Sequence, residues 1–380
     1  MKQILMSLSL SILTYNSIAQ NNAIQTIDWS IPTQLPVAEG HHKQMGLAGA
    51  IAGCHRDVFI VAGGSNFEDA LPWEGGKKKY FDDIYFLKKD INGVFTWQEK
   101  TLRLPEKKAY AAVVNTSDGI IYVGGENEKG LSDKVVLMQV FDNQINKKIS
   151  LFPNLPFALT NAAATLVNNQ LFVAGGEKID GISSALLRLD LDNLALGWKI
   201  LPDIPEKVSH TVFLNHGEKL YLLGGRQKQE SGISTLFSAC FAFNLVTQTW
   251  EKLQDLPYPL SAGTGCVVGE NTLAMFGGDK GTTFHQVEKL LVAIQAEQDL
   301  EKKQRLIQEK NQLQINHPGF SQEVLLYNIT SNQWTSTNNI GFQTPVTTQA
   351  VMWDKQIMIP CGEVKAGVRT ANILVGKLNP

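Results

Sequence analysis

Cysteine, charge of one sign and long apolar runs are all scarce in this 380-residue sequence. The formal net charge is only -2, and no basic run indicates a nucleic-acid partner. The 4 cysteines match no zinc-binding spacing, and each stands in an apolar, strand-like run. We therefore expect free, buried thiols, with a single disulfide as the alternative.

The one extended apolar run lies at the N-terminus. Lys2 precedes apolar residues from Ile4 to Leu13, and the small-x-small sequence Ser17-Ile18-Ala19 follows. This order is typical of a cleavable secretory signal peptide, and the run is too short to span a membrane. We predict that residues 1–19 are removed and that residues 20–380 form a single exported domain. A buried N-terminal strand is the alternative.

Glycine, in contrast, is abundant, with 32 residues, and many glycines occur as pairs. Each pair ends an apolar run, as in "IIYVGGENEKG" and "QLFVAGGEKIDG", and the pairs recur about every fifty residues. An aromatic residue followed by a Leu-Pro or Ile-Pro turn stands between most successive pairs. The pairs begin at Gly63, Gly124, Gly175, Gly224 and Gly277, and Cys361-Gly362 takes the sixth place.

Each repeat predicts four short strands, the second ending at the glycine pair and the fourth carrying the aromatic residue. This is the pattern of a kelch-type β-propeller blade, which buries both faces only when the blades close into a ring. The sixth repeat ends before its fourth strand, and "TIDWSIPTQLP" near the N-terminus resembles a fourth strand without a repeat. We predict an all-β, six-bladed propeller closed by this N-terminal strand. Seven blades would require a repeat that the sequence does not show.

A segment from about residue 283 to 318 interrupts the fifth blade. It contains "HQVEKLLVAIQAEQDLEKKQRLIQEKNQL", which is rich in strong helix formers with apolar residues at helical spacing. We predict one long helix or a helical hairpin. Two roles stay open, a solvated decoration on the rim and a lid over a site.

In such a ring, the loops after the glycine pairs and the turns into the first strands lie at the same mouth. Functional residues usually lie in loops on a rigid scaffold, so we expect the site there. The candidates for substrate binding are Asn66, Tyr110, His210 and Arg226, although a structural role is the alternative for His210. The first strands are predicted to begin at Tyr110, Asn161, His210, Ser261 and Thr344.

The sixth loop carries an acid, Glu363, and a base, Arg369. A surface ion pair that shapes the loop is the ordinary interpretation of such a pair. Lysines 77–79 in the first loop are either solvated or raise the local potential for an acidic ligand. Glu68 and Asp69 are further candidate carboxylates.

The sequence "CGEVKAGVRT" around Glu363 resembles the Asn-Gly-Glu-x-Lys-x-Gly-x-Arg-Thr stretch of the sialic acid mutarotases, also called N-acetylneuraminate epimerases. "AGGSNFED" with the following Lys-Lys-Lys-Tyr, and "AYAAVV" before "GGENEKGLSDKV", resemble other blades of that family, as does the helical insertion. The resemblance covers essentially the whole mature chain in a rotated blade order, which implies a cyclically permuted member. Cys361 stands where the family has asparagine.

This resemblance implies a periplasmic isomerase that interconverts the anomers of N-acetylneuraminate without a cofactor or a metal. Glu363 would move protons, and Arg369 would bind the substrate carboxylate as a two-pronged fork. The implied partner is a small acidic sugar, with no nucleic acid and no membrane insertion, and the oligomeric state stays open.

Other classes of function remain for comparison. A non-catalytic propeller that binds a sugar or a protein is the alternative, because the fold alone does not decide function. The mouth loops lack the Tyr, His and Cys set of a copper oxidase and the several arginines of a sialidase.

Overall fold

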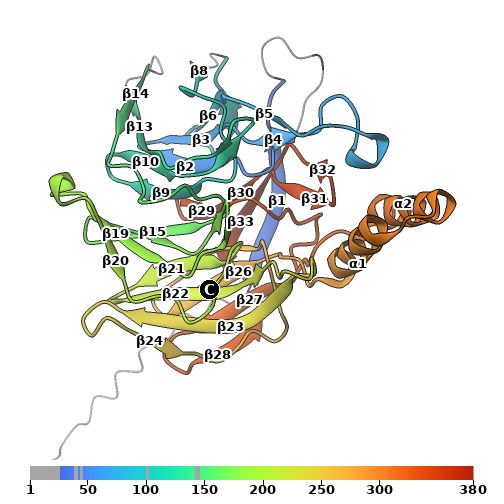
Figure 1. The fold of residues 1–380 in the computed structure, drawn as a ribbon. Coiled ribbons are helices and arrows are strands. Elements are labelled where there is room, and N and C mark those ends of the chain that lie inside the picture. The colour runs from blue at the N-terminus through green and yellow to red at the C-terminus, as the bar shows by residue number, and fades with distance from the viewer. Residues whose placement is uncertain (1–25, 38–41, 43–45, 100–101, 142–145, 380) are drawn as a thin grey trace, which may run out of the picture.

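Six antiparallel sheets stand as blades around a central axis, and a helical hairpin projects from one side (Figure 1). The computed structural model describes residues 26–37, 42, 46–99, 102–141 and 146–379. The predicted signal peptide, residues 1–19, lies outside this part of the chain. The prediction of an all-β, six-bladed propeller is confirmed.

Five blades follow the chain order from the innermost strand outwards, and β8 (Leu102–Arg103) adds a short pairing to the first of them. The five blades are β2 (Ile51–His55), β3 (Val58–Ala62), β6 (Asp83–Lys89) and β7 (Phe95–Trp97); β9 (Ala112–Thr116), β10 (Gly119–Val123), β13 (Val135–Phe141) and β14 (Asn146–Leu151); β15 (Ala163–Val167), β16 (Gln170–Ala174), β19 (Leu186–Asp190) and β20 (Trp198–Leu201); β21 (Val212–His216), β22 (Lys219–Gln227), β23 (Thr235–Asn244) and β24 (Thr249–Lys252); and β25 (Thr264–Val267), β26 (Thr272–Phe276), β27 (Val324–Asn328) and β28 (Gln333–Ser336).

The sixth blade joins the beginning and the end of the described chain, as predicted. Its inner strands are β29 (Val351–Trp353), β30 (Gln356–Pro360) and β33 (Asn372–Asn379), and its outermost strand is β1 (Thr26–Gln34). In Figure 1 the blue β1 lies beside β33 at the opposite end of the colour scale. The N-terminal strand therefore closes the ring and protects an edge that would otherwise be open.

Glycine pairs directly follow the second strand in four blades and lie within β22 in a fifth, and both glycines of each pair have a positive φ. At Gly175 and Gly176 φ is 64° and 97°, a region that favours glycine. A Cβ on Gly175 would also lie 2.2 Å from the carbonyl oxygen of Val208, at the start of the next blade. Cys361 adopts the same conformation with a φ of 57° although it carries a side chain.

The apolar core is divided into six clusters, one between each pair of neighbouring blades. Across the junction of the last and first blades, the rings of Phe59 and Trp353 lie 5.6 Å apart. The recurring tryptophans tie blades together as well: the indole N–H of Trp198 donates to the carbonyl oxygen of Pro153, and that of Trp250 to Pro202. The aromatic residue that recurs in the repeats thus reflects a contact between neighbouring blades.

The predicted insertion is a helical hairpin formed by α1 (Thr282–Ala296) and α2 (Leu300–Ile315), between β26 and β27. The side chain of Asp299 caps α2 by accepting a hydrogen bond from the backbone N–H of Lys302 at 2.9 Å. No helix of the described chain is both long and apolar enough to cross a membrane. All 4 cysteines are free, as predicted, although Cys54 is only partly buried.

A matched pair of substitutions tests the closure by β1. Ile27 in β1 is 0% exposed, whereas Ile200 in β20, also an outermost strand, is 61% exposed. We expect Ile27→Ala to lower the free energy of unfolding by about 2–5 kcal/mol, because it leaves a cavity between blades. Ile200→Ala should change it by about 0.5 kcal/mol or less. Urea unfolding monitored by circular dichroism measures both, and equal effects would contradict closure by β1.

Candidate functional site

The floor of the mouth is a ring of six residues, one from each blade, placed just before the innermost strands. Each donates its backbone N–H to the carbonyl oxygen of its counterpart in the preceding blade, and the sixth bond closes the circle, with N···O distances of 2.7–3.2 Å. Their φ angles all lie between 52° and 63°. The six are Gly49, Tyr110, Asn161, His210, Ala262 and Thr347. The positions predicted for Ser261 and Thr344 are thus held by Ala262 and Thr347.

A second ring lies beside the first and consists of the residue that follows each glycine pair or, in the sixth blade, Cys361-Gly362. Each of these residues forms a backbone bridge to the residue just before the floor, as Glu363 does with Val346. The members are Ser65, Glu126, Glu177, Arg226, Asp279 and Glu363. Four carboxylates and one guanidinium group therefore converge on one mouth.

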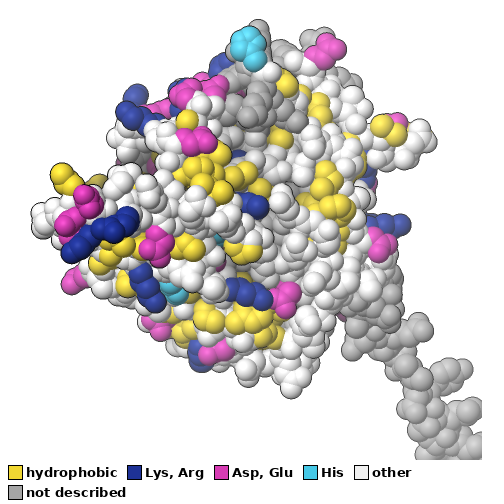
Figure 2. Space-filling view, turned by 90° about the vertical axis from the view of Figure 1, so that its right-hand side faces the viewer, with side chains coloured by type: hydrophobic (Ala, Val, Ile, Leu, Met, Phe, Trp, Pro, Cys, Tyr) yellow, Lys and Arg dark blue, Asp and Glu magenta, His cyan; other side chains and the backbone are white. Residues whose placement is uncertain are grey.

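A cavity of about 510 Å³ lies between these rings and the helical hairpin. Its lining includes five members of the second ring, Lys78 and Arg369, together with apolar side chains of Phe67, Phe284 and Phe320. Figure 2 shows the side from which the hairpin projects, where acidic and basic side chains lie close together among apolar ones. Such a lining suits a polar ligand with some apolar surface.

Glu363 and Arg369 form an ion pair within the cavity wall. They lie opposite each other in a small hairpin of β31 (Glu363–Lys365) and β32 (Val368–Arg369). Arg369 Nη2 and Glu363 Oε2 are 2.8 Å apart, and the two side chains are only 5% and 19% exposed. Glu363 Oε1 accepts a hydrogen bond from the backbone N–H of Gly367 at 3.0 Å. This pair is therefore mostly buried and fixed at both carboxylate oxygens, unlike a mobile surface ion pair.

The guanidinium group of Arg369 has hydrogen-bond donors that are not used within the described structure. Its Nε and Nη1 atoms are buried and have no hydrogen-bond partner among the described residues. The group lies over the ring of Phe67, with Cζ 4.6 Å from the ring centroid. An arginine held flat by an aromatic ring and lacking partners for two nitrogens is suited to bind a carboxylate.

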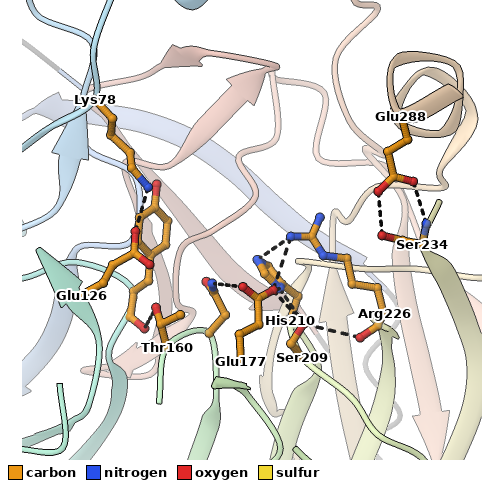
Figure 3. Close-up of polar contacts among 11 residues, drawn as sticks. Lys78, Glu126, Thr160, Glu177, Ser209, His210, Arg226, Ser234 and Glu288 are labelled. Carbon is orange, nitrogen blue, oxygen red and sulfur yellow. Dashed lines mark hydrogen bonds and ion pairs between the residues drawn. The ribbon is translucent and has the colours of Figure 1, made fainter. Parts of the chain in front are cut away.

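A second polar cluster on the wall joins Glu177, Ser209, His210 and Arg226 (Figure 3). Ser209 Oγ donates to Glu177 Oε1 at 3.0 Å, and His210 Nδ1 lies 3.3 Å from the same oxygen. Arg226 Nη2 lies 3.3 Å from His210 Nε2. The cluster therefore orients the guanidinium group of Arg226 at the cavity.

The cluster also shifts the pKa values of Glu177 and His210. Burial alone would raise the pKa of Glu177, but hydrogen bonding to His210, the charge of Arg226 and the Ser209 hydroxyl outweigh it and lower the pKa to about 2. Burial, followed by the charge of Arg226, lowers the pKa of His210. An ionised Glu177 beside a neutral His210 is the state expected at neutral pH.

A third group surrounds Lys78, which sequence analysis left as either solvated or functional. Lys78 Nζ lies 2.7 Å from Glu126 Oε1 (Figure 3). It also lies 4.9 Å from the ring centroid of Tyr110. Tyr80 donates its hydroxyl to the same oxygen at 2.6 Å. Burial alone would lower the pKa of Lys78, but Tyr110 and the hydrogen bonds to Glu126 and Tyr80 raise it overall. Lys78 is therefore a fixed cation of the cavity wall.

The hairpin is fastened to loops from two blades. Glu288 of α1 accepts hydrogen bonds from the backbone N–H and the hydroxyl of Ser234, at 2.8 and 2.7 Å (Figure 3). From α2, Asn311 Nδ2 donates to the carbonyl oxygen of Trp73 at 3.3 Å. Because the hairpin lines the cavity as well, it is part of the site and more than a decoration of the rim.

Most of the residues proposed from sequence converge here. Glu363, Arg369, Tyr110, His210 and Arg226 all line the cavity. Asn66 does not, because its amide donates to the carbonyl oxygen of Gly46 at 2.5 Å and accepts from the backbone N–H of Phe67 at 2.6 Å. The neighbouring carboxylates at positions 68 and 69 bind Lys79 instead of facing the cavity.

Sequence analysis missed Glu126, Glu177 and Asp279. The available signal was their position, since each directly follows a glycine pair and Glu363 follows Cys361-Gly362 at the equivalent place. Among the described residues, no cluster of His, Cys, Asp or Glu has the arrangement of a metal site.

Two comparisons with known proteins indicate the same family. A model of the N-acetylneuraminate epimerase family matches residues 13–146 and 152–380. Proteins named N-acetylneuraminate epimerase from Salmonella typhi and Haemophilus influenzae (strain 86-028NP) are 25% identical over 224 residues and 26% identical over 231 residues. These alignments cover 57% and 60% of this chain and 56% and 59% of the relatives. One from Vibrio vulnificus is 35% identical over 128 residues, which cover 31% of this chain and 32% of that protein. The chain thus spans less than two thirds of each relative.

The low pKa of Glu177 predicts a pH-dependent stability. Because the pKa falls from its usual 4.5 to about 2 on folding, the ionised group stabilises the fold above about pH 4.5. That contribution is lost as the pH falls towards 2. We expect Glu177→Gln to lower the free energy of unfolding by about 1–3 kcal/mol at pH 7 and by progressively less between pH 4.5 and 2. Urea unfolding across this range measures it.

Glu251→Gln is the control, because Glu251 lies on an outermost strand and is 48% exposed. It should change the stability little at any of these pH values. A loss for Glu177→Gln that stays constant down to pH 2 would contradict the assigned ionisation.

Proposed function

Because the chain belongs to the N-acetylneuraminate epimerase family, we propose that it interconverts the α and β anomers of N-acetylneuraminate in this cavity. The observation that carries the proposal is the buried Glu363–Arg369 pair in the cavity wall, with two guanidinium nitrogens that lack partners among the described residues. The sequence resemblance of the loop around Glu363 and the geometry of that loop thus support the same site.

The reaction needs only proton transfer and positioning. The anomeric hydroxyl loses a proton, the bond between the anomeric carbon and the ring oxygen breaks, and the ring oxygen gains a proton, which yields the open-chain ketone. The reverse steps on the opposite face of the carbonyl give the other anomer, so no electrons are exchanged. A carboxylate in hydrogen-bond reach, directly or through one water, can serve both steps, and we assign this role to Glu363.

Arg369 supplies the anchor for the substrate in this proposal. The substrate carries a carboxylate on its anomeric carbon, next to the bond that breaks. Nη2 carries two N–H groups, so one can stay with Glu363. The other, together with the unpaired Nε or Nη1 beside it, can bind that carboxylate as a two-pronged fork. The reacting carbon would then lie beside the catalytic acid, which is the positioning that the reaction requires.

We also propose that the protein acts in the periplasm after removal of residues 1–19. The order of charge, apolar run and small residues at the N-terminus supports export. The cyclically permuted blade order stays a prediction from the sequence.

Proton NMR of anomer equilibration tests the catalytic assignment. The α anomer is released by a sialidase at mildly acidic pH, and the approach to equilibrium is followed with and without the protein. We expect the wild type to accelerate equilibration, and Glu363→Gln to lose about 10²–10⁴-fold in rate as a general acid–base group does. Arg369→Lys should mainly raise KM, because a point charge replaces the fork.

Glu251→Gln, an exposed carboxylate substitution on an outermost strand, is the matched control and should retain full activity. Thermal unfolding of each variant confirms folding, because breaking a buried ion pair can destabilise a protein. Full activity of Glu363→Gln would refute the assigned site. Binding of the sugar by the wild type without acceleration would indicate a non-catalytic propeller.

A further inference from the structure

The C-terminal end of α2 brings polar groups to the cavity that the proton transfer does not use. Gln314 near the end of α2, and His317 and Phe320 just after it, line the cavity. None of these residues was a candidate from sequence. The roles proposed for Glu363 and Arg369 also leave them without a function.

Gln314 offers an acceptor. Its Oε1 atom is buried and has no hydrogen-bond partner among the described residues. Leaving a buried carbonyl oxygen unpaired costs free energy, so buried acceptors are normally satisfied by protein, water or ligand. Gln314 also lines the cavity, so this unpaired oxygen belongs to a side chain of the cavity wall.

His317 offers a donor three residues later. Its side chain is buried at 4% exposure, and its Nδ1 accepts a hydrogen bond from the backbone N–H of Gly319 at 3.0 Å. Burial lowers the pKa of His317, which favours the neutral ring. In a neutral ring whose Nδ1 is the acceptor, the proton lies on Nε2, which is then a donor.

Apolar side chains complete this part of the wall. The ring of Phe320 lies 4.9 Å from that of His317, and Phe284 and Val287 of α1 line the same cavity. An acceptor, a donor and an apolar surface therefore occur together. A secondary amide with a methyl group is the sugar substituent that offers the complementary donor, acceptor and apolar atoms at once.

We propose that this end of the hairpin is the subsite for the acetamido group of the substrate. Gln314 Oε1 accepts the amide N–H, His317 Nε2–H donates to the amide oxygen, and the methyl group packs on Phe284, Val287 and Phe320. This inference rests on the proposed function for the identity of the sugar, but it assigns residues and a role beyond the acid–base pair.

The hairpin is fixed to its surroundings on both sides, as a preformed subsite requires. Glu288 is bonded twice to Ser234, and the ring of His285 lies within hydrogen-bond distance of the carbonyl oxygen of Ser234, with Nε2 at 3.0 Å. The link between Asn311 and Trp73 fixes α2 on the other side. A preorganised subsite loses less free energy on binding than a mobile one.

The test compares two sugars that differ only at this group. One is N-acetylneuraminate, and the other is its analogue with a hydroxyl in place of the acetamido group, which keeps the carboxylate and the anomeric centre. For Gln314→Leu we expect KM for N-acetylneuraminate to rise about tenfold, the size of one hydrogen bond, with kcat within about threefold. KM for the hydroxyl analogue should change by less than about twofold.

Gln308→Leu is the matched control, because Gln308 is an exposed glutamine of the same helix. It should leave both sugars unaffected, and His317→Phe should reproduce the selective loss. An equal loss for both sugars would indicate a structural role and overturn the proposal, as would no loss for either.

Equilibrium binding of both sugars, measured by calorimetry, separates this inference from the proposed function. If the wild type binds but does not accelerate equilibration, the proposed function fails. A preference for the acetamido sugar that disappears in Gln314→Leu would still support the subsite. Equal binding of the two sugars by the wild type would overturn it.

Discussion

The closed ring of six backbone hydrogen bonds is the constraint on which the rest of the structure depends. Each bond joins two neighbouring blades, so a blade cannot shift without breaking bonds to both neighbours. The ring requires a left-handed turn in every blade, which costs roughly 1 kcal/mol or more at a residue with a side chain. Burial between blades and the bonds themselves offset this cost. The same turn brings Tyr110, Asn161 and His210 to the cavity floor, so closure and site formation have one geometric cause.

Features that repeat were predictable from the sequence, because they follow from backbone geometry that recurs in every blade. The glycine pairs belong to this class, and the closing N-terminal strand supplies the one strand that the sixth repeat lacks. The insertion was predictable for a different reason, its helix-forming residues with apolar side chains at helical spacing. Features that depend on a single residue of register were not. Asn66 lies one position beyond Ser65 in the short strand β4 (Ser65–Asn66), and successive residues of a strand face opposite sides. Its amide therefore serves the backbone while Ser65 occupies the ring position.

Three of the four carboxylates of the second ring are paired with cations, which explains why the mouth can still accept an acidic ligand. Glu126 is paired with Lys78, Glu177 with Arg226, and Glu363 with Arg369. The sequence indicated only the last of these pairs, because its two residues share one short loop. The other two pairs join different loops, which the sequence alone does not bring together. Each pair neutralises charge that would repel an anion. Arg369 retains unpaired donors, so the balance at that point of the wall favours a bound carboxylate.

The departure of the sixth repeat from the Gly-Gly pattern lies directly before the proposed catalytic acid. Cys361 is fully buried in the cluster between the last and first blades, where burial raises the pKa of its thiol and keeps it uncharged. A residue with a Cβ has a much narrower left-handed region than glycine. The backbone that leads into Glu363 is therefore less free than the corresponding backbone of the other blades. On the far side of the loop, the pairing of β31 with β32 fixes Arg369. The sixth blade thus exchanges the flexibility of glycine for a fixed acid and base, which is what a positioned proton transfer requires.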